Sequence, residues 1–198
     1  MRVMIFDYGA GNLHSLIKAL AASDVEITVE ADPARAARGD ALVLPGVGAF
    51  GAAATRLAPG RERVRDALRE GLPCLGICLG MQLLFDGSDE GEGAGLGVIP
   101  GRVTRLYGRR VPQIGWNTID EACDPLLART RLETAYYANG YACRPDDASY
   151  VRAWSTHESD RFAAVVRSGR TVGVQFHPEK SSRVGVAFIR AFLEEASQ

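Results

Sequence analysis

The chain has 198 residues, of which 46% are hydrophobic and 24% are charged, and its formal net charge at pH 7 is −1. These values are typical of a globular protein with a sizeable buried core, and they do not indicate a nucleic-acid-binding or membrane-surface protein. No apolar run is long enough to span a bilayer. We therefore expect one domain that covers residues 1–198.

The amino-terminal residues 1–7 are too short in their apolar part for a signal peptide, and they predict a first strand. Four cysteines without an export signal indicate a reducing cytoplasm rather than a disulfide framework. We interpret Cys74, Cys123 and Cys143 as buried free thiols. Cys74 and Cys78 have no matching His/Cys pair nearby, so we expect neither a metal site nor a cofactor.

Strand-like and helix-like segments alternate through the first third of the chain. Strands are predicted at 3–6, 25–29 and 41–44, and helices at 12–22 and 61–70. Such alternation predicts parallel strands joined by crossover helices, with helices on both faces of the sheet. The arginines of the 61–70 helix are interpreted as a solvated face rather than a binding patch.

A short apolar run entered through Pro73 leads to a cysteine flanked by glycines, Gly76-Ile77-Cys78-Leu79-Gly80, and then to helix-favouring residues up to Phe85. This is the nucleophile-elbow pattern with sulfur in place of oxygen, in which a sharp strand-to-helix turn requires nearly bare positions on both sides. At a helix N-terminus Cys78 is favoured as thiolate. We interpret Cys78 as a nucleophile rather than a structural thiol.

The glycine cluster at 46–51 formally matches the dinucleotide-binding pattern G-x-G-x-x-G. It follows the third strand rather than the first, and the charged helix stands where the acidic strand end should be. Nucleotide binding is therefore the weaker interpretation. Beside a thiol nucleophile, such a loop can point a backbone N–H at an oxyanion.

The acidic, glycine-rich stretch 86–95 is predicted as a flexible loop. Further strands are predicted at 103–107, 111–116, 136–141, 151–154, 162–166 and 172–176. They indicate a partly antiparallel extension of the sheet, and hence a three-layer α/β fold with an open, mostly parallel sheet. The chain ends in an amphipathic helix with Val184, Phe188 and Phe192 on one stripe.

A thiolate that attacks an amide needs a base for the leaving amine and a group that orients the base. Of the three histidines, His14 is interpreted as an exposed or interface helix residue, and His157 as part of a hairpin turn. His177 stands at the end of an apolar strand. Glu179, two residues on, points the same way in an extended segment and can accept from the imidazole. We therefore pair His177 and Glu179 with Cys78.

Three segments together resemble the class I (triad-type) glutamine amidotransferases, whose fold is flavodoxin-like: residues 45–48, 76–82 and 175–179. Four more narrow the resemblance to the glutaminase subunits of imidazole glycerol phosphate synthase, at 7–12, 95–101, 115–117 and 179–181. The resemblance covers nearly the whole chain.

The resemblance implies that Cys78 attacks the glutamine amide, His177 protonates the departing ammonia and Glu179 orients His177. It places the oxyanion on the N–H groups of Val47 and Leu79. The same resemblance implies residues that line the substrate pocket, Gly48, Gln82 and Tyr141, and residues that face a partner, Asn12, Trp116 and Lys180.

The implied partner is a (β/α)8-barrel synthase subunit in a heterodimer. It would use the ammonia to make imidazole glycerol phosphate and an aminoimidazole carboxamide ribotide. We further expect the glutaminase to idle until the synthase ligand binds, because the Gly46-Val47 peptide must turn its N–H toward the oxyanion.

Two departures from the family pattern concern the pocket and the interface. The commoner pattern before Gly-Trp-Asn is Pro-His-x, whereas this chain has Pro112-Gln113-Ile114. The commoner pattern before the tyrosine is His-Ser or His-Thr, whereas Asn139-Gly140 precede Tyr141 here. A neutral amide cannot titrate as histidine does. Two alternatives stay open, the glutaminase subunit of another class I system and a non-catalytic regulatory subunit on the same fold.

Overall fold

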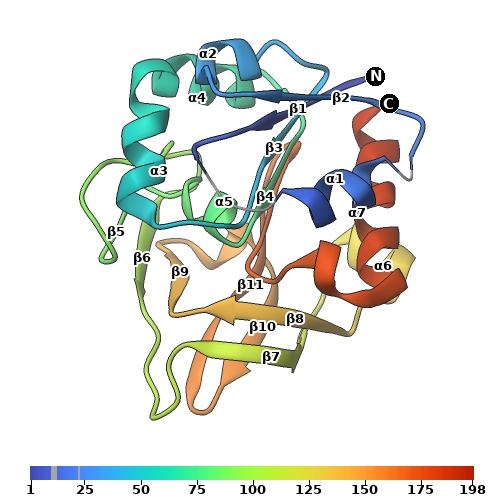
Figure 1. Ribbon diagram of the computed structural model, residues 1–198. Helices are drawn as coiled ribbons and strands as arrows, with labels where there is room; N and C mark the ends of the chain where they lie inside the picture. The colour runs from blue at the N-terminus through green and yellow to red at the C-terminus, as the bar shows by residue number, and fades with distance from the viewer. Residues whose placement is uncertain (10–12, 22) are drawn as a thin grey trace.

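A seven-stranded sheet forms the centre of the computed structural model, which describes residues 1–9, 13–21 and 23–198 (Figure 1). The strand order is β10-β11-β12-β4-β3-β1-β2. The parallel strands are β1 (Arg2–Phe6), β2 (Glu26–Glu30), β3 (Ala41–Leu44), β4 (Cys74–Ile77) and β12 (Thr171–Val174). The antiparallel strands β10 (Val151–His157) and β11 (Asp160–Ser168) extend one edge. The predicted fold class is confirmed.

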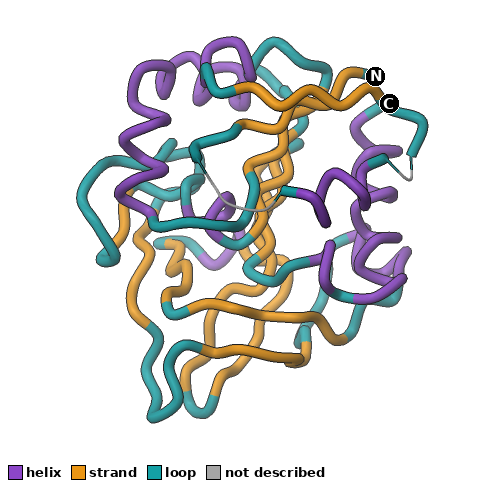
Figure 2. Tube along the Cα trace, viewed as in Figure 1, coloured by secondary structure: helices purple, strands orange, loops and turns teal. Residues whose placement is uncertain are grey.

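Helices cover both faces of this sheet (Figures 1 and 2). One face carries α1 (His14–Leu20), α6 (Pro125–Thr130) and α7 (Ser182–Ala196), and the other carries α2 (Pro33–Ala36), α3 (Phe50–Leu57) and α4 (Arg61–Arg69). The short helix α5 (Leu79–Gln82) follows β4, and three 3-10 turns complete the set, η1 (Ala58–Gly60), η2 (Ala148–Tyr150) and η3 (Pro178–Lys180).

Alternation along the strands divides the core into two layers. Val3 and Ile5 of β1 pack into the cluster that includes Phe188 and Phe192 of α7. Met4 and Phe6 of the same strand pack into the cluster that includes residues of α3 and α4. Since successive strand side chains point to opposite faces, this arrangement gives the three layers that the sequence predicts.

Two smaller sheets lie beside the main one. The first contains β5 (Gly87–Ser88), β6 (Gly101–Arg105) and β9 (Tyr141–Pro145), and the second contains β7 (Gln113–Thr118) and β8 (Thr134–Asn139). Among the described residues, the predicted extension is correct for 151–154, 162–166 and 172–176, which join the main sheet as β10, β11 and β12. It is wrong for 103–107, 111–116 and 136–141, which belong to the two smaller sheets. The stretch predicted as a loop contains β5, which is buried and pairs with β6.

Three local predictions need correction. Val184 is 37% exposed, because the buried stripe of α7 runs through Gly185, Phe188 and Phe192 and Val184 lies beside it. Cys123 is exposed, and its thiol donates to the carbonyl of Arg152 (3.3 Å), whereas Cys74 and Cys143 are buried free thiols as predicted. Within the described residues, no helix is long and apolar enough to cross a membrane, and no cluster of potential metal ligands occurs.

Candidate active site

Cys78 occupies a strained turn between β4 and α5. Its backbone angles are φ 46° and ψ −102°, an unfavourable combination for a residue with a side chain. A Cβ on Gly76 would stand 2.7 Å from the carbonyl oxygen of Gly80, and a Cβ on Gly80 would stand 2.0 Å from that of Leu44. The bare positions are therefore a packing requirement, and the predicted strand–cysteine–helix order is confirmed.

The sheet register brings His177 to this turn from a distant part of the sequence. β12 runs parallel to β4 with Val174 opposite Ile77, so both strands end at the same edge. The His177 ring hydrogen-bonds with the Cys78 side chain, and its Nδ1 lies 2.8 Å from Oε1 of Glu179. The segment after His177 turns into η3 rather than staying extended, because Pro178 suits the first position of a helical turn.

Burial and partners act in opposite directions on the pKa of His177, whose side chain is 3% exposed. Burial lowers this pKa, but the hydrogen bonds to Cys78 and Glu179 and the charges of these two groups outweigh it and raise the pKa to about 9. The backbone of His177 is held as well. Its N–H donates to the carbonyl of Tyr136 (2.8 Å), and its carbonyl accepts from the hydroxyl of Ser181 (2.6 Å). The base is thus charged at neutral pH and fixed in place.

A cavity of about 210 Å³ opens over the sulfur of Cys78. Of the residues that the sequence singled out, its lining includes Val47, Gly48, Cys78, Leu79, Gln82, Asn139, Gly140, Tyr141, His177 and Lys180. Leu79 is the first residue of α5, so its N–H is one of the donors that a helix leaves unsatisfied at its start. A Cβ on Gly46 would stand 2.9 Å from Cε1 of His177, so the glycine loop approaches the imidazole closely.

Glu90 also lines this cavity, and the sequence did not single it out. Its Oε2 accepts from the N–H of Phe50 (2.9 Å), the first residue of α3, which fixes the carboxylate beside the cavity. In the sequence Glu90 is one of several acidic residues of the stretch 86–95, and nothing in their spacing distinguishes it.

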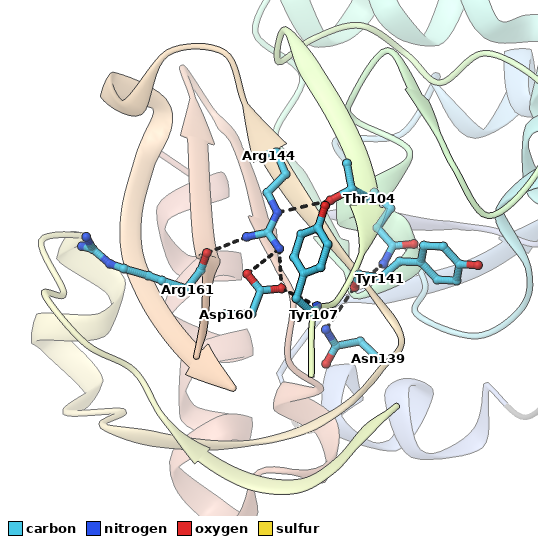
Figure 3. A network of polar contacts seen from close by, with 8 residues as sticks. Thr104, Tyr107, Asn139, Tyr141, Arg144, Asp160 and Arg161 are labelled. Carbon is cyan, nitrogen blue, oxygen red and sulfur yellow. Dashed lines mark hydrogen bonds and ion pairs between the residues drawn. The ribbon is translucent and has the colours of Figure 1, made fainter. Parts of the chain in front are cut away.

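An ion pair and several hydrogen bonds fix strand β9 (Figure 3), whose first residue, Tyr141, lines the cavity. The carbonyl of Tyr141 accepts from Nδ2 of Asn139 (3.0 Å) and from Nε2 of Gln82 (3.3 Å). Further along β9, Nη2 of Arg144 lies 2.7 and 2.6 Å from the two carboxylate oxygens of the buried Asp160. Because charge-assisted bonds of this kind are directional, they hold β9 at a defined distance from β11.

The residues predicted to face a partner do not all fall within the described part of the chain. Asn12 lies outside it. Trp116 on β7 is 57% exposed and contacts the ring of Tyr136 edge-on, and Ile114 on the same strand is 69% exposed. Lys180 is exposed and borders the cavity. Trp116 and Lys180 therefore lie at the surface, as a docking role requires.

The other histidines stand apart from the cavity lining. His14 is exposed at the start of α1. His157 ends β10 at the hairpin to β11, as predicted, and its Nε2 lies 2.6 Å from the carbonyl oxygen of Arg110.

A thiol on a strained turn, an imidazole in contact with it and a carboxylate behind the imidazole form the arrangement expected for acyl transfer from an amide. The model of the glutamine amidotransferase class-I family matches residues 4–196, and the chain belongs to this family. Solved structures agree in fold. A glutamine amidotransferase superposes with a TM-score of 0.74 at 22% identity over 99% of both chains. Another, from Thermotoga maritima, gives a TM-score of 0.66 at 20% identity over 100% of this chain and 84% of that one.

Curated relatives narrow the comparison. The chain is 45% identical to imidazole glycerol phosphate synthase subunit HisH of Symbiobacterium thermophilum, over 95% of this chain and 91% of the relative. It is 40% identical to the subunit of the same name from Halobacterium salinarum, over 97% of this chain and 92% of the relative. A HisH subunit from Thermus thermophilus is 41% identical, over 96% of this chain and 95% of the relative.

Proposed function

We propose that this chain is the glutaminase subunit of imidazole glycerol phosphate synthase and serves histidine biosynthesis in the cytoplasm. It hydrolyses glutamine to glutamate and ammonia. The observation that carries the proposal is the contact between His177 and Cys78 on the strained turn, with Glu179 on the far side of the imidazole. The identity of 40–45% to the HisH subunits named above supports the particular system.

The first half of the reaction forms a thioester. The Cys78 thiolate attacks the side-chain amide carbon of glutamine, a C–S bond forms and the carbonyl π electrons move to oxygen. The C–N bond then breaks, while His177 transfers its proton from Nε2 to the departing nitrogen. Glu179 keeps the ring oriented through Nδ1 and stabilises its positive charge (2.8 Å). Water then attacks the thioester, His177 takes a proton from it, and glutamate and the thiolate are released.

The oxyanion of each tetrahedral intermediate is held by backbone N–H groups. We assign these donors to Leu79, at the start of α5, and to Val47, in the glycine loop that lines the same cavity. One such donor accounts for roughly a 10²–10³-fold rate effect in a well-characterised protease. The Val47 donor depends on the orientation of the Gly46-Val47 peptide, and we propose that the liganded partner sets this orientation.

The amino-acid end of glutamine carries a cation and an anion, and the cavity offers a matching group for the cation. We assign the α-ammonium to Glu90, which lines the cavity and whose carboxylate is held there by the N–H of Phe50. Gly48, Gln82 and Tyr141 complete the substrate pocket, with Gln82 and Tyr141 joined by the hydrogen bond at 3.3 Å.

Ammonia released into water at neutral pH becomes ammonium, which is not a nucleophile. We therefore propose that the chain forms a heterodimer with a (β/α)8-barrel synthase subunit that receives the ammonia directly. The docking surface includes Lys180, which borders the cavity, and the exposed Trp116 on β7, and the family resemblance adds Asn12. The partner converts the ammonia into imidazole glycerol phosphate and an aminoimidazole carboxamide ribotide.

Glutamate release by the wild-type chain and by Cys78→Ala, each alone and with the liganded barrel partner, tests the proposal. We expect turnover only for the wild type, and a large increase with the partner. Equal rates for the wild type with and without the partner would contradict the activation mechanism. Turnover by the wild type with the partner of another class I system, and not with the barrel synthase, would favour the alternative system.

A further inference from the structure

A second side chain besides His177 contacts the sulfur of Cys78. The carboxamide of Gln175 is completely buried, and its Nε2 donates to Sγ of Cys78 at 3.5 Å. The other end of this carboxamide, Oε1, is buried and has no hydrogen-bond partner among the described residues. The nucleophile therefore lies between a charged donor and a neutral one.

The sheet register explains the position of Gln175. Val174 stands opposite Ile77, and the N–H of Cys78 donates to the carbonyl of Val174 (2.7 Å). The N–H of Gln175 donates to the carbonyl of Ala164 on β11 (2.9 Å), so its backbone is held on the other side as well. Strand β12 ends at Val174, and the bend at residues 175–176 brings the side chains of both Gln175 and His177 to Cys78.

An amide is an unusual group for this position unless its N–H is used. A buried carbonyl oxygen without a partner is unfavourable, and an apolar side chain of the same shape would avoid this cost. The contact with sulfur supplies a compensating interaction, because a hydrogen bond to a charged acceptor is stronger than one to a neutral acceptor. A glutamine does not titrate, so it remains a donor at every pH at which the enzyme operates.

We propose that Gln175 is a catalytic residue that donates a hydrogen bond to the Cys78 thiolate and directs its sulfur toward the cavity. This proposal rests on the glutaminase function proposed above. Gln175 neither gains nor loses a proton. Its N–H···S bond weakens as the C–S bond forms and charge leaves the sulfur, and it forms again when hydrolysis returns the thiolate.

Two effects of this bond oppose each other, and together they give a distinctive signature. Loss of the donor raises the pH at which the thiolate forms, by roughly one unit or more for a hydrogen bond to a charged group. The remaining thiolate becomes more nucleophilic, and with a Brønsted coefficient of about 0.4–0.5 its reaction rate rises roughly threefold per unit. Replacement of a side chain that only fills space would change neither the pH at which the thiolate forms nor its nucleophilicity.

The test is the rate of Cys78 alkylation by iodoacetamide as a function of pH, followed by mass spectrometry of the full-length chain. The exposed Cys123 is first replaced by serine, and Cys74 and Cys143 are buried. The native ionisable groups that face Cys78 are the same in every variant. They are His177 after β12, with Glu179 behind it, Tyr8 after β1 and Cys143 on β9. Thr171→Val is the matched control, because it removes a buried polar group from β12 in line with Cys74 rather than Cys78.

For Gln175→Leu we expect the alkylation midpoint to move up by about one pH unit and the plateau rate to rise about threefold. Glutaminase kcat at neutral pH should fall roughly three- to tenfold, with KM nearly unchanged, because the gain in nucleophilicity offsets part of the loss of thiolate. Gln175→Glu keeps the shape of the side chain and places an anion beside the sulfur, so it should move the alkylation midpoint further upward. If the leucine variant does not fold, the glutamate variant tests the proposal in its place.

A midpoint and plateau equal to those of Thr171→Val in both Gln175 variants would overturn the proposal and leave Gln175 a packing residue. This outcome differs from a failure of the glutaminase function itself, which would appear as undiminished glutamine turnover by Cys78→Ala.

Discussion

The turn at Cys78 and the two-stranded β7–β8 ribbon differ in how far their side chains are buried. The turn lies at the end of central strand β4, Cys78 is 6% exposed, and neighbouring backbone contacts its flanking glycines closely. The ribbon has only two strands, and its Ile114 and Trp116 are 69% and 57% exposed. The position of the nucleophile is therefore fixed by the internal packing of the chain, whereas the docking surface presents apolar side chains to solvent.

The two regions meet at Tyr136 on β8. Its ring contacts Trp116, and its carbonyl accepts from the N–H of His177. A change in the position of the ribbon can thus be transmitted to the catalytic base through Tyr136. This contact gives a physical route by which a partner on the ribbon can affect a site that it does not touch.

The largest expected effect concerns the packing of the turn. Gly80→Ala places a Cβ 2.0 Å from the carbonyl oxygen of Leu44, in backbone that cannot move without disrupting β3. We expect a loss of about 3 kcal/mol or more in unfolding free energy, measured by urea denaturation. Gly140→Ala is the control, since its Cβ would meet Pro112 at an ordinary 3.8 Å. Equal stability of the two variants would show that the turn is not limited by packing.

The next effect concerns the base and its orienting carboxylate. His177→Asn removes proton transfer to the leaving nitrogen, and we expect glutamine turnover to fall roughly 10²–10⁴-fold. Glu179→Gln keeps the imidazole in place and loses the charge that stabilises it, so its loss in kcat should be smaller. Steady-state glutaminase assays with the liganded partner measure both. A greater loss for Glu179→Gln than for His177→Asn would reverse the roles assigned to the two residues.

A pH effect follows from the raised pKa of His177. Because this pKa is about 9 in the folded chain, the His177 interactions stabilise the fold fully below the unfolded pKa of about 6.5, and this contribution is lost as the pH rises through 9. The difference in unfolding free energy between the wild type and His177→Asn should shrink between pH 6.5 and 9, by at most about 3 kcal/mol.

In Cys78→Ala the pKa of His177, followed by NMR, should fall, since one of the two groups that raise this pKa is gone. An unchanged pKa would show that Cys78 does not hold the proton on the ring.

The smallest effect concerns the ribbon. Trp116→Ala should leave the stability of the isolated chain almost unchanged, because the side chain is already exposed. It should weaken binding of the barrel partner roughly tenfold or more, as loss of an aromatic interface residue does. Val29→Ala on β2, at the opposite end of the molecule and 45% exposed, is the matched control (Figure 1). Calorimetric titration with the partner measures both, and equal affinities would place the docking surface elsewhere.

Strong local signals made part of this arrangement predictable. The glycines around Cys78 restrict the backbone to one kind of turn, and the apolar runs before Cys78 and His177 predict that each residue follows a strand. The parallel pairing that ends both strands at one sheet edge became visible only in the structure. The pairing of His177 with Glu179 followed from their spacing, although the segment between them turns into η3.

Other features depend on contacts between distant residues. The predicted strand 136–141 ran across the boundary between β8 and β9, and residues 142–145 were not predicted as a strand. Strand β9 is defined by pairing with β6 and by the Arg144–Asp160 ion pair rather than by its own composition. Glu90 became distinguishable only through its bond to Phe50, and Gln175 only through the register that places it beside Cys78. Exposure of Val184 and Cys123 likewise depends on which neighbours cover them.

The most direct test of the account is to trap the covalent intermediate. Wild-type chain with the liganded partner is quenched in acid during glutamine turnover, and the Cys78 peptide is weighed by mass spectrometry. We predict an added γ-glutamyl group on Cys78 in the wild type, and neither adduct nor ammonia from Cys78→Ala. Ammonia release by Cys78→Ala at the wild-type rate would contradict the central claim that this sulfur carries the reaction.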